Sequence, residues 1–178
     1  ENYNKNIKLD IDTQPLDPPI FNFSYDKNDN LDLNKHFVKL FKDIYPQLNQ
    51  IIELKNETKE KIKIGFVSKF FTNHTIEKLF KGIIFNLDKK KFDINIFHSQ
   101  EKVNPDFLKK EKQSNIKNFI LPKLFEEKVN FILNKGLDII FYPDIGMSTE
   151  LYYLTFLKLA KKQITSWGHP ETSGNPSI

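Results

Sequence analysis

The chain contains no cysteine among its 178 residues. This absence excludes disulfide frameworks and thiolate zinc sites, and it permits a reducing compartment. No apolar run approaches the roughly 20 residues that a helix needs to cross a bilayer. The first residues also lack the apolar segment of a signal peptide. We therefore expect a cytoplasmic protein without a membrane partner.

The chain also lacks the glycine patterns that bind phosphate groups. Neither Gly-x-Gly-x-x-Gly nor a P-loop occurs, which disfavours a free-standing nucleotide-binding domain. The four histidines do not form the close-spaced ligand pairs of a metal site. We therefore expect neither a metal nor a cofactor.

No strongly basic face stands out in the sequence. The 27 basic residues are scattered among 23 acidic ones, and the formal net charge is +4. Nucleic acid is therefore not an expected partner. The length suits about one domain with a core of its own.

The first 60 residues differ in pattern from the rest. Residues 1–30 are polar and interrupted by prolines, which predicts an extended arm that packs its aromatic residues on the protein. Residues 31–60 place apolar side chains at three- and four-residue steps, as on one face of a helix. These positions are Leu33, Phe37, Leu40, Phe41, Ile44 and Leu48. Asp32 or Asn34 is expected to cap this helix, and Pro46 to end its first part.

From residue 61 onward, strand candidates alternate with helical stretches. The predicted strands are Ile62–Ser68, Phe92–His98, Asn118–Leu121, Leu137–Tyr142 and Gln163–Trp167. The predicted helices are Thr75–Leu87, Pro105–Gln113, Lys123–Asn134 and Thr149–Leu159. Such alternation gives βαβ units with right-handed crossovers. We therefore predict that residues 61–178 form an α/β, Rossmann-like domain with a mostly parallel sheet and flanking helices.

A strand, a short polar turn and an amphipathic helix follow one another between Lys61 and Gly82. The turn carries His74, which should lie just beyond the carboxyl end of the strand. Open α/β sheets bind ligands at that position. His74 is therefore our candidate catalytic residue.

Turns after three predicted strands carry the other candidates. Parallel strands share one direction, so these turns should reach the same edge of the sheet. Glycines there allow a ligand close to the backbone, and hydroxyls supply hydrogen bonds. The candidate binding residues are Asn73, Gly146, Met147, Ser148, Gly168, His169, Pro170 and Thr172.

Each candidate also has a purely structural interpretation. His74 can bond the backbone at the helix start, and Asn73 is an ordinary N-cap residue. His169 can be a turn residue held extended by the following proline. Asp144 can cap the helix that follows it. Trp167 is expected in the core rather than as a stacking platform.

Three motifs together resemble a known family. They are Lys61-Ile-Lys-Ile-Gly-Phe-Val-Ser68 with Phe71, His74, Leu79 and Gly82; the segment Gly136–Ser148; and Trp167-Gly-His-Pro-Glu-Thr-Ser-Gly174. In this order they are similar to the amino-terminal half of the catalytic region of glycosyltransferase family 41. That family contains the O-linked N-acetylglucosamine transferase, the plant SPINDLY proteins and bacterial tetratricopeptide-repeat relatives. The resemblance covers about residues 31–178.

The resemblance implies a GT-B enzyme with two facing Rossmann-like domains and a nucleotide-sugar donor, a UDP-sugar, in the cleft. It implies inverting, metal-independent transfer to hydroxyls of a polypeptide acceptor. His74 falls on the family's active-site histidine. One loop near the donor sugar contains Gly168, His169 and Pro170, and a second contains Gly146, Met147 and Ser148.

The chain departs from the family pattern at several positions. Lys69 or Phe70 replaces an acidic residue, Thr75 a proline and Met147 a histidine. The family holds its nucleotide mainly with a carboxyl-terminal Rossmann domain, which would follow residue 178. We therefore expect this polypeptide alone to be folded but inactive. The alternative is a Rossmann-like binding or scaffold module of the same family that has lost catalysis, which the Lys69 and Met147 departures support.

Overall fold

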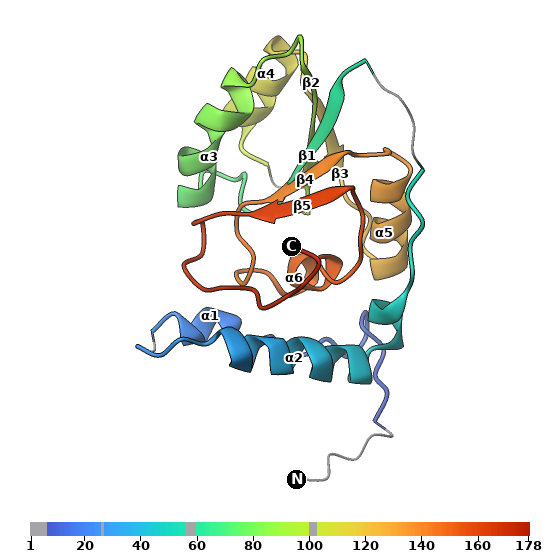
Figure 1. The fold of residues 1–178 in the computed structure, drawn as a ribbon. Coiled ribbons are helices and arrows are strands. Elements are labelled where there is room, and N and C mark those ends of the chain that lie inside the picture. The colour runs from blue at the N-terminus through green and yellow to red at the C-terminus, as the bar shows by residue number, and fades with distance from the viewer. Residues whose placement is uncertain (1–6, 26, 56–59, 100–102) are drawn as a thin grey trace.

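A five-stranded parallel sheet forms the centre of the computed structural model, which describes residues 7–25, 27–55, 60–99 and 103–178 (Figure 1). The strands are β1 (Ile62–Ser68), β2 (Phe92–His98), β3 (Lys117–Ile120), β4 (Ile139–Tyr142) and β5 (Lys162–Thr165). Their order is β3-β2-β1-β4-β5, and every neighbouring pair is parallel. This is the strand order of a doubly wound sheet. The predicted α/β, Rossmann-like fold is therefore confirmed.

Helices cover both faces of the sheet. They are α3 (Thr75–Asn86), α4 (Pro105–Gln113), α5 (Phe125–Leu133) and α6 (Thr149–Leu154). Neighbouring β1 residues point to opposite faces, since Phe66 joins the apolar cluster under α3 and α4 and Val67 joins the cluster with α5 and α6. Both faces of the sheet are covered, which explains why β4 (Ile139–Tyr142) is apolar at successive positions, as expected for a strand buried on both sides.

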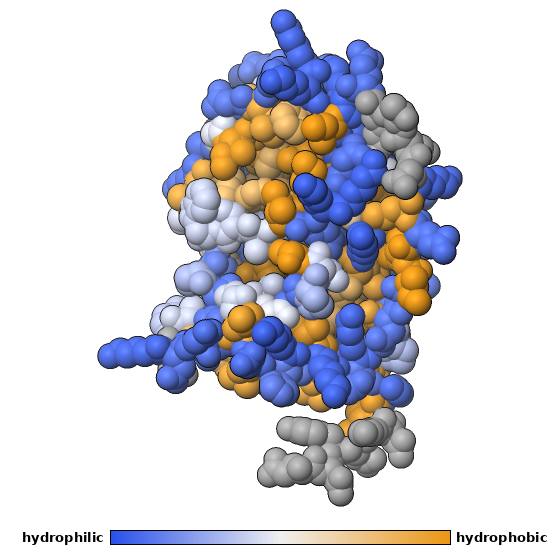
Figure 2. Space-filling model, viewed as in Figure 1, coloured by the Kyte–Doolittle hydropathy of each residue, from blue (hydrophilic) through white to orange (hydrophobic). Residues whose placement is uncertain are grey.

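Helices α3 and α4 leave one part of their sheet face open. Leu79 and Ile83 on the flank of α3, and Ile164 on β5, are exposed apolar side chains. Figure 2 shows apolar residues, in orange, on this side of the molecule within a hydrophilic surround. Among the described residues, no helix combines the length and apolar character needed to cross a membrane.

The amino-terminal part packs on the α6 side of the sheet. It contains α1 (Ile20–Phe23), α2 (Leu31–Ile44) and the 3-10 helix η1 (Pro46–Asn49). The ring of the fully buried Tyr45 contacts the ring of Tyr153 in α6, with 5.2 Å between their centroids. Its hydroxyl donates to the Gln14 carbonyl and accepts from the Leu16 N–H, each at 2.8 Å. The arm is thus fastened to the body by Tyr45 as well as by its apolar side chains.

Several element bounds agree with prediction, and others need correction. Strands β1 and β2 and helix α4 begin and end at the predicted residues. Residue Asn30, and not Asp32 or Asn34, occupies the N-cap of α2, without a side-chain hydrogen bond. Helix α6 ends at Leu154 because the next backbone bonds span three residues and form successive turns. Apolar periodicity does not distinguish such turns from a longer helix.

Trp167 is the clearest correction to the predicted core. Its side chain is 70% exposed, because the residue lies beyond the end of β5 and no helix of the described residues covers it. One face of its indole leans on the ring of Phe80 in α3, with 5.7 Å between the ring centroids.

Candidate functional site

Three turns meet at the carboxyl edge of the sheet. They follow β1, β4 and β5, and the edge between β1 and β4 is the topological switch point where ligands bind in such folds. A Cβ on Gly168 would lie 1.9 Å from the carbonyl oxygen of Pro143 and 2.9 Å from Cδ1 of Ile76. The turn after β5 therefore contacts both the turn after β4 and the start of α3. The predicted convergence on one edge is present.

His74 is held by the first turn of α3. Its Nδ1 accepts a hydrogen bond from the Ile76 N–H at 3.2 Å, so the imidazole acts as the N-cap of the helix. The neutral ring consequently carries its hydrogen on Nε2, by the geometry of that bond. The ring is half-buried and lies 4.7 Å from the ring of Phe70. In this conformation His74 offers a hydrogen-bond donor at Nε2.

The turn that carries His74 is itself fixed by the buried Glu77. Asn73 adopts a φ of 68°, and its N–H donates to Oε2 of Glu77 at 2.6 Å. The Asn104 side chain donates to both Glu77 oxygens at 3.0 Å. Asn73 is therefore a left-handed turn residue and not the N-cap, a position that His74 occupies.

His169 and Gly146 pack directly against each other. Gly146 has a φ of 98°, and a Cβ there would lie 2.9 Å from Nδ1 of His169. The other side of the imidazole stacks on Phe21 of the arm, with 5.2 Å between ring centroids. His169 is 5% exposed, and neither ring nitrogen has a hydrogen bond of normal geometry among the described residues, although the backbone of Phe21 approaches the ring. Burial lowers the pKa of His169, and the charge of Glu171 opposes that shift.

Asp144, for which the sequence suggested only a helix cap, lies buried at this edge of the sheet. It lies two residues after the end of β4 and is 2% exposed, and the cap position of α6 belongs to Ser148. Burial raises the pKa of Asp144 to about 7. The Ser68 hydroxyl and the Lys69 N–H approach and oppose this shift, but no hydrogen bond of normal geometry reaches the carboxylate within the described residues. A buried carboxyl group with a shifted pKa at a switch point lowers stability when it is charged, and such groups are typical of functional sites.

The remaining candidates lie toward the rim of this region. Met147 and Ser148 line a hollow of about 340 Å³ that also contains Lys69 and residues of the arm. The Thr172 carbonyl accepts from the Asn34 side chain at 2.9 Å, which ties this residue to α2. Pro170 is exposed. The structure thus brings Gly146, Gly168 and His169 into contact with the central turns and leaves Pro170 and Thr172 outside those contacts.

The described residues contain no group of three or more acidic or histidine side chains placed to hold a metal ion. Two further hollows, of about 460 and 420 Å³, lie at the opposite, amino edge of the sheet. Their position is far from the point where doubly wound sheets bind ligands. We therefore assign the candidate site to the carboxyl edge.

Comparison with known proteins supports the fold. No protein-family model matches the chain, and no curated protein matches it in sequence. A solved structure of the Thermobaculum terrenum O-GlcNAc transferase, the K341M mutant, is similar with a TM-score of 0.72 at 14% identity. The similarity covers 90% of this chain but 31% of that chain. The chain therefore shares the Rossmann-like architecture found in part of a glycosyltransferase.

Proposed function

We propose that this chain is the amino-terminal part of the catalytic region of a protein glycosyltransferase. The full protein would be an inverting enzyme that uses a UDP-sugar, acts on polypeptide hydroxyls and needs no metal. A second Rossmann domain of the same protein would complete the donor site. One observation carries the proposal: the turns bearing His74, Gly146 and Gly168 meet at the switch point of a chain shaped like part of an O-GlcNAc transferase.

The residues at this edge suit sugar transfer. In the reaction, the acceptor oxygen forms a bond to the anomeric carbon, the bond from that carbon to the diphosphate oxygen breaks so that UDP leaves, and the hydroxyl proton passes to water. The Nε2–H of His74 would donate a hydrogen bond to an oxygen of the acceptor or of the leaving diphosphate. Gly146 and Gly168 would allow the donor close to the backbone. The buried carboxyl group of Asp144 would influence the electrostatic potential at this edge of the sheet.

Transfer assays on the full-length protein test the proposal. A panel of UDP-sugars should give hydrolysis or transfer, and His74→Ala should lower the rate at least about 10²-fold, the low end for loss of a hydrogen-bond donor at the reacting oxygen. His74→Asn is the matched variant, because asparagine can cap α3 while lacking the imidazole. We expect both variants to lose activity and His74→Asn to keep its folding stability. Wild-type rates in both variants would remove His74 from the mechanism.

The second candidate function is a non-catalytic, Rossmann-like binding module of similar shape. Two observations favour it: Met147 stands where the family pattern has a polar residue, and the ring of His169 is covered by Phe21 and Gly146. Calorimetry on the full-length protein separates the two functions. UDP binding without hydrolysis or transfer of any UDP-sugar would support the module.

A further inference from the structure

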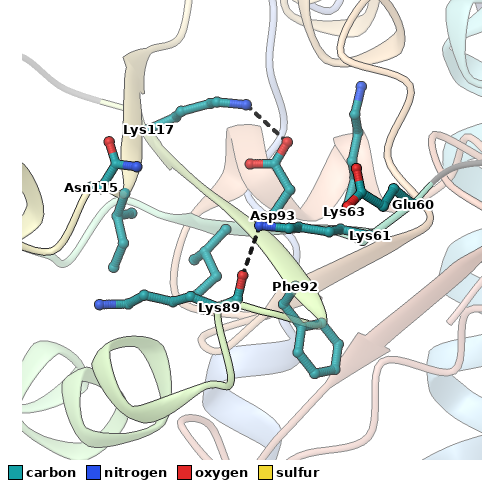
Figure 3. Close-up of a pocket in the computed structure, with 10 residues that line it drawn as sticks. Glu60, Lys61, Lys63, Lys89, Phe92, Asp93, Asn115 and Lys117 are labelled. Carbon is teal, nitrogen blue, oxygen red and sulfur yellow. Dashed lines mark hydrogen bonds and ion pairs between the residues drawn. The ribbon is translucent and has the colours of Figure 1, made fainter.

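The amino edge of the sheet forms a lysine-lined surface. A hollow of about 460 Å³ opens there, where β1, β2 and β3 begin (Figure 3). It adjoins a second hollow of about 420 Å³, with which it shares Glu60, Lys61 and Phe92. The lysines that line the two hollows are Lys61, Lys63, Lys89, Lys90, Lys91, Lys117 and Lys161. We call these residues the lysine edge.

The lysine edge holds the entire net charge of the chain. Its seven lysines face three acidic residues in the same lining, Glu60, Asp93 and Asp138, which leaves a formal charge of +4. The whole chain also has a charge of +4, so the other 20 lysines are balanced by 20 acidic residues. The lysines come from four separate segments of the sequence, and the strand order brings these segments together. The expectation that no basic face exists therefore needs correction.

Two of the three acidic residues of this surface are already paired with lysines. Asp93 pairs with Lys117 at 2.8 Å, and Asp138 pairs with Lys161 at 3.0 Å (Figure 3 shows the first pair). Lys61 donates to the Lys89 carbonyl at 3.0 Å, a contact that leaves its charge unneutralised. The ammonium of Lys89 points away from these contacts (Figure 3).

A fixed turn presents three consecutive lysines beside the hollows. Lys89, Lys90 and Lys91 are all exposed, and none has an ion pair within the described residues. Asp88 holds the turn, because its carboxylate accepts from the Lys90 N–H at 2.9 Å and its carbonyl accepts from the Lys91 N–H at 3.0 Å. Because the backbone of the turn is already fixed, only the lysine side chains lose conformational freedom when an opposite charge binds.

We propose that the lysine edge binds an acidic polypeptide segment, rich in Asp and Glu, by charge complementarity. The chain has no arginine, which is the residue best suited to bidentate phosphate recognition. Among the residues lining the two hollows, Phe92 is the one aromatic, so the stacking platform of single-stranded nucleic-acid sites is missing. Concave pockets with separate ammonium groups suit the carboxylates of side chains on a peptide. This inference does not depend on the proposed function, since the surface lies at the opposite edge of the sheet.

Fluorescence anisotropy of a labelled oligoglutamate peptide tests the proposal with the 178-residue chain. The test variant reverses the turn, with Lys89→Glu, Lys90→Glu and Lys91→Glu. The matched control is Lys27→Glu, Lys35→Glu and Lys39→Glu, which reverses three exposed lysines on and before α2, at the other end of the molecule (Figure 1). Both variants have the same formal charge of −2. Thermal unfolding of each verifies that it is folded.

The expected result is binding by wild type and control that weakens between about 0.05 and 0.15 M salt. The turn variant should bind on the order of tenfold or more weakly. Equal weakening in both variants would show an effect of overall charge and overturn the proposal. Two further results would also overturn it: no binding of the peptide at low salt, or tighter binding of a single-stranded oligonucleotide or of anionic lipid vesicles than of the peptide.

Discussion

The two edges of the sheet are built in opposite ways. At the carboxyl edge, turns pack so closely that Gly168 has no room for a methyl group, and Asp144 and His169 are buried without hydrogen bonds of normal geometry to described residues. At the amino edge, lysines stand in solvent around open hollows, and their ion pairs are partly exposed. The carboxyl edge therefore contains close contacts and buried polar groups that lower stability, and the amino edge does not.

This difference separates two kinds of function. Buried polar groups and crowded turns lower stability, and they persist where a site needs a fixed geometry. Exposed lysines cost little stability and act over longer distances on charged partners. The carboxyl edge is therefore suited to chemistry or to a shaped ligand, and the amino edge to electrostatic attraction.

The sharpest way to break the comparison is to remove the charge of Asp144. Its pKa rises from 3.8 to about 7 on folding, so the folded protein binds the proton more tightly than the unfolded chain between these values. The unfolding free energy contributed by this group therefore falls as pH rises from about 4 to about 7. Asp144→Asn should match wild type near pH 4 and exceed it by at most about 4 kcal/mol above pH 7.

Urea denaturation of both proteins across this pH range measures the difference. Other carboxylates titrate in both proteins, so their contributions cancel. Parallel stability curves from pH 4 to pH 8 would show that Asp144 ionises at no cost, and the contrast between the edges would then disappear.

A pair of glycine substitutions gives the next largest effect. Gly168→Ala should lower the unfolding free energy by about 3 kcal/mol, because the new Cβ would lie 1.9 Å from the Pro143 carbonyl oxygen. Gly82→Ala makes the same chemical change in α3, where nothing lies within 4 Å. It should raise the stability by up to about 1 kcal/mol. Equal effects of the two substitutions in denaturant titrations would contradict the close contact of the turns.

The smallest effect belongs to the amino edge. The side chains of Lys117 and Asp93 are 57% and 23% exposed, so solvent and salt screen their attraction. A double-mutant cycle with Lys117→Ala and Asp93→Ala should give a coupling energy below about 1 kcal/mol. A coupling above about 2 kcal/mol would place this edge among the tightly built regions.

Local patterns predicted much of the fold. β1 and β2 combine isoleucine with aromatic residues and are followed by polar residues in the sequence, and α4 begins at a proline, so their bounds could be read from neighbouring residues. The end of α6 could not, because the same apolar spacing continues into tight turns. Trp167 was placed wrongly because its burial depends on whether another layer covers the end of β5.

The candidate site was predictable in position but not in detail. The turn with His74 could be placed at the carboxyl edge from strand direction alone. The capping bond of its Nδ1 depends on the backbone of that turn. The burial of Asp144 and the gathering of the lysines both follow from the order of the strands, which joins residues far apart in the chain. The order of the strands cannot be read from the residues of any single segment of the sequence.

The arm gives the carboxyl edge a dependence on residues at the other end of the sequence. Phe21 covers one side of the His169 ring, and a methyl group of Ile20 lies 3.2 Å from the Cβ position of Gly146. The helical periodicity begins at Leu31, which suggests that residue as a starting point for a shorter protein. Such a protein would expose the His169 imidazole and remove both hydrogen-bond partners of the Tyr45 hydroxyl. Anyone choosing expression boundaries should therefore keep the proline-broken stretch.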